Sequence, residues 1–506
     1  MNLALVLEMV ASGLGDQTAI TTADRQVSYA ELDDLAGRAA DLFEDGGASA
    51  VFYLGTSHVA FPVALFGAAV AGVPFIPLNY RLGAKQLDHM VAAHPGAVMV
   101  ADRPRADAWS SLIAHHERQD FLALLDHPER PSRERSASDD AELPAVLLYT
   151  SGTTAAPKAA VLRHRHLTAY LMGTVEFAGA DPSDAALVTV PPYHVAGLAN
   201  LLSNLYAGRR IVYLENFSAT AWLETVRDEG VTNAMVVPAM LARIVEAVGD
   251  GALADVPSLR SLSYGGARMP ITVLERAFAM FPDVGLVNAY GLTETSSTIA
   301  LLGPEDHRQA LLSSDPVVRA RLGSVGRALP GIEVEVRDEV GTVLPVGEVG
   351  LMFVRGEQVA GEYAGLSMLD DEGWFPTRDR GHVDADGYLF IEGRADDTII
   401  RGGENIAPAE IEDEIHAHPD VADVAVIGVA DEEWGQRLVA VVVRRPEATV
   451  DEEGLRAFVR ERLRSSKTPD EVRFRDELPR TDTGKLLRRQ LVDEAAGAAR
   501  TGPRSV

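Results

Sequence analysis

Short apolar runs alternate with segments whose apolar positions recur at helical spacing along the amino-terminal part of the chain. The runs predict strands at residues 50–54, 98–101, 145–149, 186–190, 210–214, 234–237, 259–264 and 285–288. Helices predicted at 82–93 and 219–229 lie between them, and residues 1–14 fit a short amphipathic helix. Strands that alternate with helices predict α/β layers with a mostly parallel sheet.

The pattern changes after residue 321. Gly and Asp turns separate short strands at 332–337, 349–354 and 388–391, which is typical of a β-rich subdomain. A new α+β pattern then begins, with a helix at 409–417, strands at 421–429 and 438–443, and a helix at 452–464. We therefore expect a large N-terminal domain over residues 1–393, a hinge at 394–397 and a small α+β C-terminal domain over 398–506.

The composition narrows the class of protein. Of the 506 residues, 47% are hydrophobic and 24% are charged, which is the profile of a soluble globular enzyme. The absence of cysteine excludes disulfides, thiolate metal sites and a cysteine nucleophile. A net charge of −28 argues against nonspecific binding of nucleic acid. We find no signal peptide and no apolar run long enough to cross a membrane, and we expect a cytoplasmic protein.

The basic residues are almost all arginine. Lysine stands only at positions 85, 158, 467 and 485, although Lys and Arg together number 46. A lysine is a compact charge on a flexible stem, which the planar arginine fork does not reproduce. The retained lysines are therefore candidates for a specific role, and nucleotide bias is the alternative.

The segment Tyr149–Lys158 is a strand end followed by Thr-Ser-Gly-Thr-Thr-Ala-Ala-Pro-Lys. Such a loop can turn several backbone N–H groups and hydroxyls toward one anion, for which a nucleotide triphosphate is the obvious ligand. It is not a Walker A loop, because Pro157 precedes Lys158 and Ala159 follows it. A polar surface loop with a chance lysine is the alternative.

Three further segments carry candidate chemistry. In Asn288-Ala-Tyr-Gly-Leu-Thr-Glu294, a carboxylate next to hydroxyls after a strand suits magnesium, and Tyr290 can stack on a base. Asp379 and Arg394 can accept from and donate to ribose hydroxyls, although ordinary surface turns would look similar. Lys485 stands on a loop before an arginine-rich helix, from which it can reach across a cleft.

Together these segments resemble the adenylate-forming superfamily of acyl-CoA synthetases, peptide-synthetase adenylation domains and luciferases. The resemblance runs from Ser28 to Lys485, and the segments 191–194, 263–267 and 323–327 also fit the order of the family's motifs. It implies that ATP and a carboxylic acid form an acyl-adenylate and pyrophosphate. The acyl group then passes to coenzyme A, or, as the alternative, to an amine, as in an amide-bond synthetase.

The resemblance also implies roles for single residues. Lys485 would bridge acid and phosphate oxygens, and Thr293 and Glu294 would serve phosphate and Mg²⁺. The outgoing phosphates are expected at Ser151, Gly152, Thr153, Thr154 and Lys158, the adenine at Gly265, Gly266, Ala267 and Tyr290, and the ribose at Asp379 and Arg394, with further nucleotide contacts at Thr150, Asn288 and Gly291. His194 would border the acid pocket, or be a neutral core histidine.

The family's C-terminal domain is mobile, and Asp396 matches its hinge. Rotation about this hinge would withdraw Lys485 and bring the loop 401–408 to the site for the second step. The sequence departs from the family at Ala155, Ala159 and Arg378, where glycine is usual. Because alanine resists a positive φ, the phosphate loop is expected to differ, and Arg378 adds a charge near the ribose.

The acceptor and the acid remain open at this stage. Basic residues of the C-terminal domain can receive coenzyme A phosphates or can form a solvated face; they are Arg401, Arg444, Arg445, Arg460, Arg462, Arg464 and Lys467. A separate carrier protein is another possible acceptor, and a non-catalytic nucleotide or acyl sensor is a further alternative. Residues 195–200, Tyr264 and Met269 predict a mainly apolar acid pocket without a buried cation, unless Arg268 supplies one.

Overall fold

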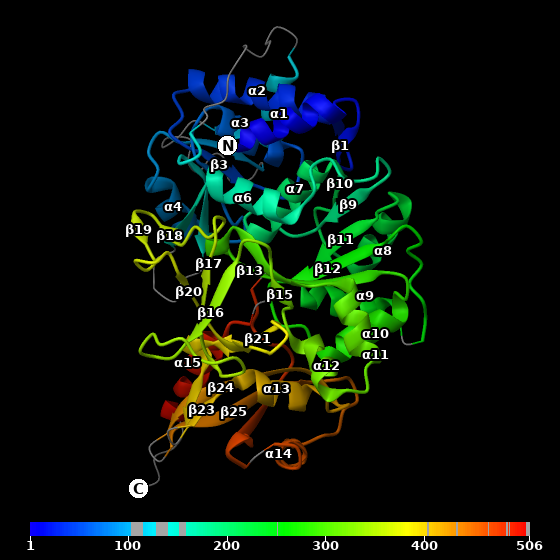
Figure 1. Cartoon of the computed structure of the whole chain (residues 1–506), viewed down its shortest axis with the longest axis vertical. Helices are drawn as coiled ribbons and strands as arrows, with labels where there is room; N and C mark the ends of the chain where they lie inside the picture. Colours follow the sequence, from blue (N-terminus) through cyan, green and yellow to red (C-terminus); the bar gives the residue numbers. More distant parts are fainter. Residues whose placement is uncertain are drawn as a thin grey trace.

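The computed structural model describes residues 1–102, 115–127, 140–150, 158–249, 251–401, 404–431, 434–463, 465–481, 484 and 486–501. Two large sheets form the amino-terminal part, a four-stranded sheet follows, and the chain after residue 398 gathers at the lower end of the molecule (Figure 1). The fold is therefore mixed α/β, with a large N-terminal domain and a smaller C-terminal domain.

The first sheet has eight strands in the order β19-β18-β8-β7-β4-β3-β5-β6. Its members are β3 (Val51–Leu54), β4 (Phe75–Pro77), β5 (Val98–Ala101), β6 (His115–Glu117), β7 (Pro144–Thr150), β8 (Lys158–Arg163), β18 (Glu362–Tyr363) and β19 (Leu366–Ser367). Strands β3, β4, β5, β6 and β7 pair in parallel, and β7 and β8 form an antiparallel pair in which Thr150 lies opposite Lys158.

The second sheet has nine strands in the order β15-β14-β13-β12-β11-β9-β10-β1-β2. Its members are β1 (Thr18–Thr21), β2 (Gln26–Ser28), β9 (Ala185–Val188), β10 (Arg210–Tyr213), β11 (Asn233–Val236), β12 (Ser261–Gly265), β13 (Gly285–Leu292), β14 (Ser297–Leu302) and β15 (Arg327–Ala328). Strands β9 to β13 are parallel. Their carboxyl ends therefore lie at one edge, where open α/β sheets usually bind ligands.

The third sheet contains β16 (Glu333–Arg337), β17 (Gly350–Arg355), β20 (Phe375–Val383) and β21 (Leu389–Arg394), all antiparallel. The C-terminal domain contains β22 (Ile399–Arg401), β23 (Glu404–Ile406), β24 (Val421–Asp431), β25 (Gly435–Arg444) and β26 (Glu471–Arg475). This domain has an apolar core of its own, which includes Ile411, Val426 and Leu455.

Fifteen helices cover the sheets within the described residues. They are α1 (Leu3–Leu14), α2 (Tyr29–Asp45), α3 (Ala60–Val70), α4 (Ala84–Ala92), α5 (Arg118–Leu125), α6 (His164–Thr174), α7 (Val195–Ala207), α8 (Ala219–Asp228), α9 (Pro238–Val248), α10 (Ile271–Met280), α11 (Pro304–Leu312), α12 (Pro316–Ala320), α13 (Pro408–His416), α14 (Glu452–Arg460) and α15 (Arg488–Thr501). Helix α7 packs against β9, β10 and β14 of the second sheet, and its apolar face joins the largest core.

The periodicity located these elements well. The strands expected at 98–101 and 210–214 are β5 and β10, and the helix expected at 219–229 is α8. Mostly parallel pairing in the large sheets confirms the α/β prediction. Strand β21 ends at Arg394 and β22 begins at Ile399, while the exact boundaries at 393 and 397 stay a prediction.

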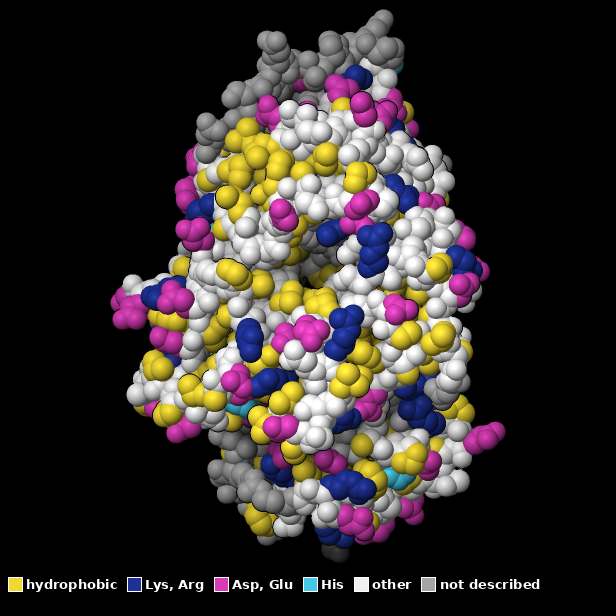
Figure 2. Space-filling model, turned by 45° about the vertical axis from the view of Figure 1, so that its right-hand side comes forward, with side chains coloured by type: hydrophobic (Ala, Val, Ile, Leu, Met, Phe, Trp, Pro, Cys, Tyr) yellow, Lys and Arg dark blue, Asp and Glu magenta, His cyan; other side chains and the backbone are white. Residues whose placement is uncertain are grey.

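The distribution of charge on the surface and the lengths of the helices bear on binding to nucleic acids and membranes. Acidic and basic side chains are interspersed on the face drawn in Figure 2, which is hollowed at mid-height and shows no broad basic area among its described residues. Within the described residues, no helix is long and apolar enough to cross a membrane.

Candidate active site

The predicted nucleotide segments converge at the carboxyl edge of the second sheet. Gly265 ends β12 and pairs with Ala289 of β13, and β13 leads directly into the turn that carries Thr293 and Glu294. Strand β20 of the third sheet brings Asp379 to Tyr290. Residues that are far apart in the sequence thus form one site.

At the expected ribose end, three side chains form a closed set of contacts. The Tyr290 hydroxyl donates to Asp379 at 2.5 Å, and the Arg394 guanidinium lies 3.1 Å from the other carboxylate oxygen. Arg394 also donates to the Thr377 carbonyl at 2.8 Å, which fixes its orientation. Burial, together with the Asp379 charge, raises the pKa of Tyr290, so this phenol stays a hydrogen-bond donor.

Arg378 stands in the turn before Asp379 and adopts a backbone conformation that is unusual for a residue other than glycine. Its φ is +62°, in the left-handed region that favours glycine. The turn before Asp379 therefore keeps the shape that a glycine would give, and the arginine bears the strain. Ala159 is different, because it lies in β8 opposite Tyr149 in extended conformation and needs no glycine.

Glu294 lies on a short 3₁₀ turn (Thr293–Thr295) and is held on both sides. The Tyr363 hydroxyl donates to its carboxylate, and the backbone amides of Ala360 and Gly361 donate to its carbonyl. Burial and the Glu294 charge raise the pKa of Tyr363, which therefore remains protonated. Tyr363 lies outside every motif of the sequence analysis, and no local pattern marks it as a site residue.

A magnesium ion fits this turn only together with phosphate oxygens. Among the described residues, no cluster of three or more His, Asp or Glu side chains is arranged to hold a metal. Magnesium usually keeps several waters and binds through one or two carboxylates plus substrate phosphates. The half-buried Glu294, with one side held by Tyr363, suits that mode.

The phosphate loop closes the β7–β8 pair. Thr150 and Lys158 are the two residues at its base, and Lys158 is exposed there. Tyr363 interacts with Thr150 as well as with Glu294, which places the base of the loop beside the carboxylate. Ser151, Gly152, Thr153, Thr154 and Ala155 lie outside the described residues.

The adenine segments are tightly packed. A Cβ at Gly265 would lie 2.3 Å from the Ala289 carbonyl oxygen, and one at Gly291 would lie 1.8 Å from that of Ser297. Only glycine fits at either position. The Asn288 amide donates to the Ser324 carbonyl at 3.1 Å, which joins β13 to the segment 323–327. Gly266 is exposed beside the half-buried Ala267.

The C-terminal domain touches the N-terminal domain near this edge. Gly484 lies against Ala239 at the start of α9, since a Cβ there would be 3.1 Å from the Ala239 Cβ. Arg268 and Asp413 form an ion pair across the same boundary. Lys485 itself lies outside the described residues, so its predicted position is not tested.

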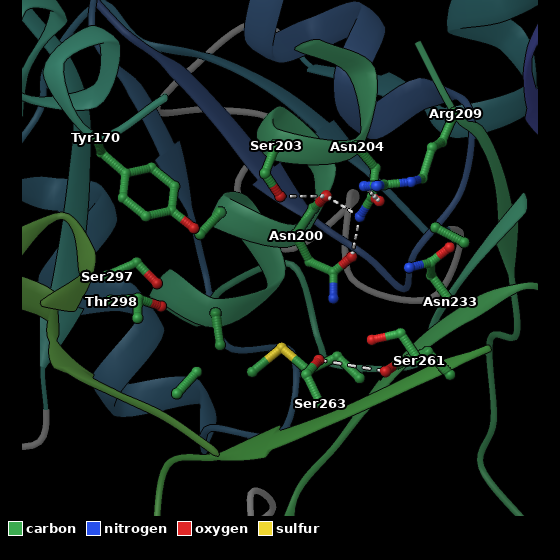
Figure 3. Close-up of a pocket in the computed structure, with 16 residues that line it drawn as sticks. Tyr170, Asn200, Ser203, Asn204, Arg209, Asn233, Ser261, Ser263, Ser297 and Thr298 are labelled. Carbon is green, nitrogen blue, oxygen red and sulfur yellow. Dashed lines mark hydrogen bonds between the residues drawn. The ribbon is translucent and has the colours of Figure 1, made fainter. Parts of the chain in front are cut away.

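A cavity of about 180 Å³ opens beside the nucleotide segments, under α7 (Figure 3). Its lining comes from α6, α7 and the strands β9 and β11 to β14, and comprises Tyr170, Ala186, Ala196, Ala199, Asn200, Ser203, Asn204, Arg209, Asn233, Ala234, Met235, Ser261, Ser263, Ala289, Ser297 and Thr298. Ala289 lies between two nucleotide candidates, Asn288 and Tyr290. The cavity is therefore the candidate acid pocket.

The lining of this cavity differs from the mainly apolar acid pocket that the sequence predicted. The lining is rich in amides and hydroxyls, and it contains Arg209. Tyr264 is fully buried on the opposite face of β12, where its hydroxyl contacts His307 at 2.8 Å, because successive side chains of a strand alternate in direction. Met269 and Arg268 also lie outside this cavity. Of the expected segment, Ala196, Ala199 and Asn200 do line it.

His194 and the C-terminal basic residues are also located. His194 is the N-cap residue of α7 and packs against the Tyr193 ring, with ring centroids 4.5 Å apart. Arg401 pairs with Asp470 at 2.6 Å, Lys467 pairs with Glu410, and Arg444 stacks over the Phe474 ring. The first two basic groups thus have internal counter-charges. Arg464 lies outside the described residues.

Comparison with known proteins gives a consistent result. The sequence model of the AMP-binding enzyme family matches residues 7–364, and that of the AMP-binding enzyme C-terminal domain matches residues 410–485. The fatty acid–[acyl-carrier-protein] ligase ScoC of Streptomyces coeruleorubidus is 33% identical over 95% of this chain and 93% of its own length. The indoleacetate–CoA ligase of Aromatoleum aromaticum is 34% identical over 94% of this chain and 95% of its own.

Solved structures agree with the sequence comparison. ATP-bound MatB from Rhodopseudomonas palustris has a TM-score of 0.87 and 28% identity, covering 98% of this chain and 100% of that chain. Apo MatB has a TM-score of 0.76 with the same identity and coverage. The o-succinylbenzoate coenzyme A synthetase of Bacillus subtilis with ATP and magnesium has a TM-score of 0.83 and 27% identity, covering 96% and 98% of the two chains. The chain therefore belongs to the AMP-binding enzymes of the adenylate-forming superfamily, and within it to the AMP-forming acid–CoA ligases.

Proposed function

We propose that this chain joins a carboxylic acid to coenzyme A in two steps. In the first, a carboxylate oxygen of the acid bonds to the α-phosphorus of ATP, and the bond to the leaving pyrophosphate breaks. In the second, the thiol sulfur bonds to the acyl carbon, the bond to AMP breaks, and the thiol proton is released. The observation that carries this proposal is the cavity, whose lining includes Ala289 of the predicted nucleotide segment and the residues Ser297 and Thr298 just after it.

The proposed nucleotide contacts follow from the charges at that edge. The buried Asp379, oriented by Tyr290 and Arg394, accepts the ribose hydroxyls. The space beside Gly265, Gly266, Ala267, Asn288, Tyr290 and Gly291 receives the adenine. Thr150, Ser151, Gly152, Thr153, Thr154 and Lys158 surround the phosphates. Fixed groups of this kind hold ATP in one orientation relative to the acid, which lowers the entropic cost of reaction.

The reacting carboxylate and the triphosphate repel each other, and positive charge must offset this repulsion. Lys485 is proposed to place its ammonium between the carboxylate and the α-phosphate, where charge develops. Thr293 and Glu294 hold the phosphate end together with Mg²⁺, which supplies Lewis-acid charge stabilisation when bound. His194, the N-cap residue of α7, is proposed to border the acid pocket.

A change of domain arrangement is proposed to separate the two steps. The TM-score is higher against ATP-bound MatB than against apo MatB at equal identity and coverage, so this arrangement is closer to the ATP-bound one. The contact of Gly484 with Ala239 supports an adenylation arrangement, since it brings the residue before Lys485 to the N-terminal domain. Rotation near Asp396 would then admit coenzyme A.

Coenzyme A is favoured over the other acceptors. The indoleacetate ligase and the o-succinylbenzoate synthetase are both named for coenzyme A, whereas ScoC is named for an acyl carrier protein. An amine acceptor is not favoured, because none of these relatives is named for one. A carrier protein remains the acceptor to test beside coenzyme A.

The test is pyrophosphate release with a panel of acids, followed by mass spectrometry after coenzyme A, an acyl carrier protein or an amine is added. We expect acid-dependent pyrophosphate, and acyl-CoA only in the coenzyme A reaction. Adenylate that ignores coenzyme A but loads the carrier protein or the amine would replace the proposed acceptor. ATP binding without pyrophosphate for any acid would contradict the ligase function and favour a sensor.

A further inference from the structure

The far end of the acid cavity carries a cation. Tyr170, Ser297 and Thr298 lie on one side of the cavity and Arg209 and Asn233 lie on the other (Figure 3). Ser297 and Thr298 follow the Glu294 turn directly, so their side is the reactive end. Asn233 and Ser261 begin β11 and β12, and Ser261 is four residues before Gly265, about 13 Å away along the strand. Arg209 therefore lies away from the reacting carboxylate.

Arg209 forms no ion pair within the described residues. One of its terminal nitrogens donates to the Asn204 amide oxygen at 3.2 Å, while its Nε is buried without a partner. The carboxylate that most influences it is Asp184, which pairs with Arg260 at 3.0 Å. The next residue in the chain differs, because Arg210 pairs with Glu229 at 2.7 Å. A partly buried guanidinium without a counter-ion is costly unless a ligand supplies the charge.

The amides around Arg209 are oriented to donate. Asn204 accepts from Arg209 and donates to the Asn200 side-chain oxygen at 2.6 Å. This contact uses the acceptor of Asn200, whose amide nitrogen points into the cavity (Figure 3). Asn233 accepts from the Thr232 hydroxyl at 2.8 Å, which likewise leaves its N–H groups as donors. A cation surrounded by donors favours an oxyanion over an apolar group.

We propose that the acid substrate carries a second acidic group at its far end, and that Arg209 binds this group with Asn200 and Asn233. The inference rests on the proposed acid-activating function and specifies its substrate class as carboxylic acids with a terminal oxyanion, such as dicarboxylic acids. An acid with an apolar end would leave the guanidinium and the amide donors desolvated and unpaired, which disfavours its binding.

The proposal is tested by acid selectivity. Glutarate, adipate and suberate are compared with pentanoate, hexanoate and octanoate by the kcat/KM for pyrophosphate release. We expect the best dicarboxylic acid to exceed its monocarboxylic partner by about tenfold or more, since one hydrogen bond to a charged group corresponds to about that factor. A preference for the monocarboxylic acids would overturn the inference while leaving the ligase function intact.

Variants of Arg209 assign the effect to this side chain. Arg209→Met keeps much of the stem and removes the charge, and we expect it to lower the dicarboxylate-to-monocarboxylate ratio about tenfold or more. Arg209→Lys should restore part of the ratio, because it restores the charge without the planar fork. Arg227→Met is the matched control, since Arg227 pairs with Asp255 at the surface, outside the cavity. It removes the same charge and should leave the ratio unchanged.

Two outcomes would contradict the assignment. An unchanged ratio in an Arg209→Met protein that still activates monocarboxylic acids would exclude Arg209, and this residual activity also reports correct folding. Equal rates with adipate and with the hydroxy-terminated hexanoic acid would exclude an oxyanion as the recognised group. If no acid released pyrophosphate, the ligase function would fail. Calorimetric binding of adipate, and its weakening by Arg209→Met, would then still decide the inference.

Discussion

At the ribose end of the site, Asp379 contacts both Arg394 and the Tyr290 hydroxyl, whereas at the far end of the acid cavity Arg209 contacts only an amide among the described residues. The first set of charges is balanced before any ligand arrives. For the second, we propose that a ligand supplies the balancing oxyanion. On this proposal the first end binds a constant substrate, the nucleotide, and the second end selects among acids.

The largest expected effect concerns Lys485, which is proposed to bridge the acid and the α-phosphate. Lys485→Ala should lower acid-dependent pyrophosphate release about 10²- to 10³-fold, because a charge-stabilising donor is lost where charge develops. Thiolysis of supplied acyl-adenylate should be spared. Lys85→Ala is the control, since Lys85 is exposed on α4. Equal loss of both half-reactions would remove the proposed role and would leave the two ends without a common cation.

Removing a charge at the ribose end should lower activity with every acid, whereas removing the Arg209 charge should lower it only with acids that carry a second acidic group. Asp379→Asn is expected to lower kcat/KM for ATP about 10- to 100-fold, because it removes one charged hydrogen-bond acceptor. Its effect should be the same for every acid, unlike that of Arg209→Met. The surface residue Asp386, which pairs with Arg321, supplies the control Asp386→Asn. A loss at Asp379 that depends on the acid would break the comparison.

The close packing of β12 against β13, at Gly265 and Ala289, is expected to tolerate no added side chain. Gly265→Ala should lower the free energy of unfolding by about 1–3 kcal/mol, because its Cβ would meet the Ala289 carbonyl oxygen at 2.3 Å. Gly13→Ala is the opposite case: Gly13 lies in α1 with no atom within 4 Å of an added Cβ. It should stabilise the protein by about 0.5–1 kcal/mol. Equal shifts of the unfolding temperature in Gly265→Ala and Gly13→Ala would contradict the close packing around Gly265.

The smallest effect is expected at the ribose turn. Arg378→Gly should raise the free energy of unfolding by up to about 1 kcal/mol, because it relieves a left-handed φ of +62°. The gain is partly offset by the greater flexibility of glycine in the unfolded chain. Arg380→Gly, two residues further along β20, has no such strain to relieve and should destabilise. Denaturant titration distinguishes the two signs.

The sequence predicted the nucleotide side of the site better than the acid side. Asp379, Arg394 and Tyr290 stand in short motifs, and their side chains meet in the fold, while their roles toward a nucleotide stay a prediction. The acid cavity is lined by residues from α6, α7 and five strands, with no motif among them. Arg209 and Tyr363 were missed because nothing local distinguishes a residue that faces a cavity from one that faces solvent.

The prediction that Tyr264 lines the acid pocket failed for the same reason. Its apolar neighbours correctly predicted a strand, but they did not determine which face of the strand would border the cavity. In the structure Ser261 and Ser263 line the cavity, and Tyr264 points away toward His307. A shift of one residue along a strand exchanges its two faces, so predicting the strand did not predict which of its side chains line the cavity.

The class of fold, the order of the elements and the family could be predicted from the residues alone, because periodicity and short motifs are local properties of the chain. The sequence also determined the chemistry available, through the absence of cysteine and the position of each candidate lysine. Which polar groups face each other depended on the folded chain. Asp379 pairs with Arg394 on the neighbouring strand β21, whereas no ion pair holds Arg209 among the described residues. The physical reason is that charge balance in a folded protein depends on distance and burial, which many long-range contacts fix together.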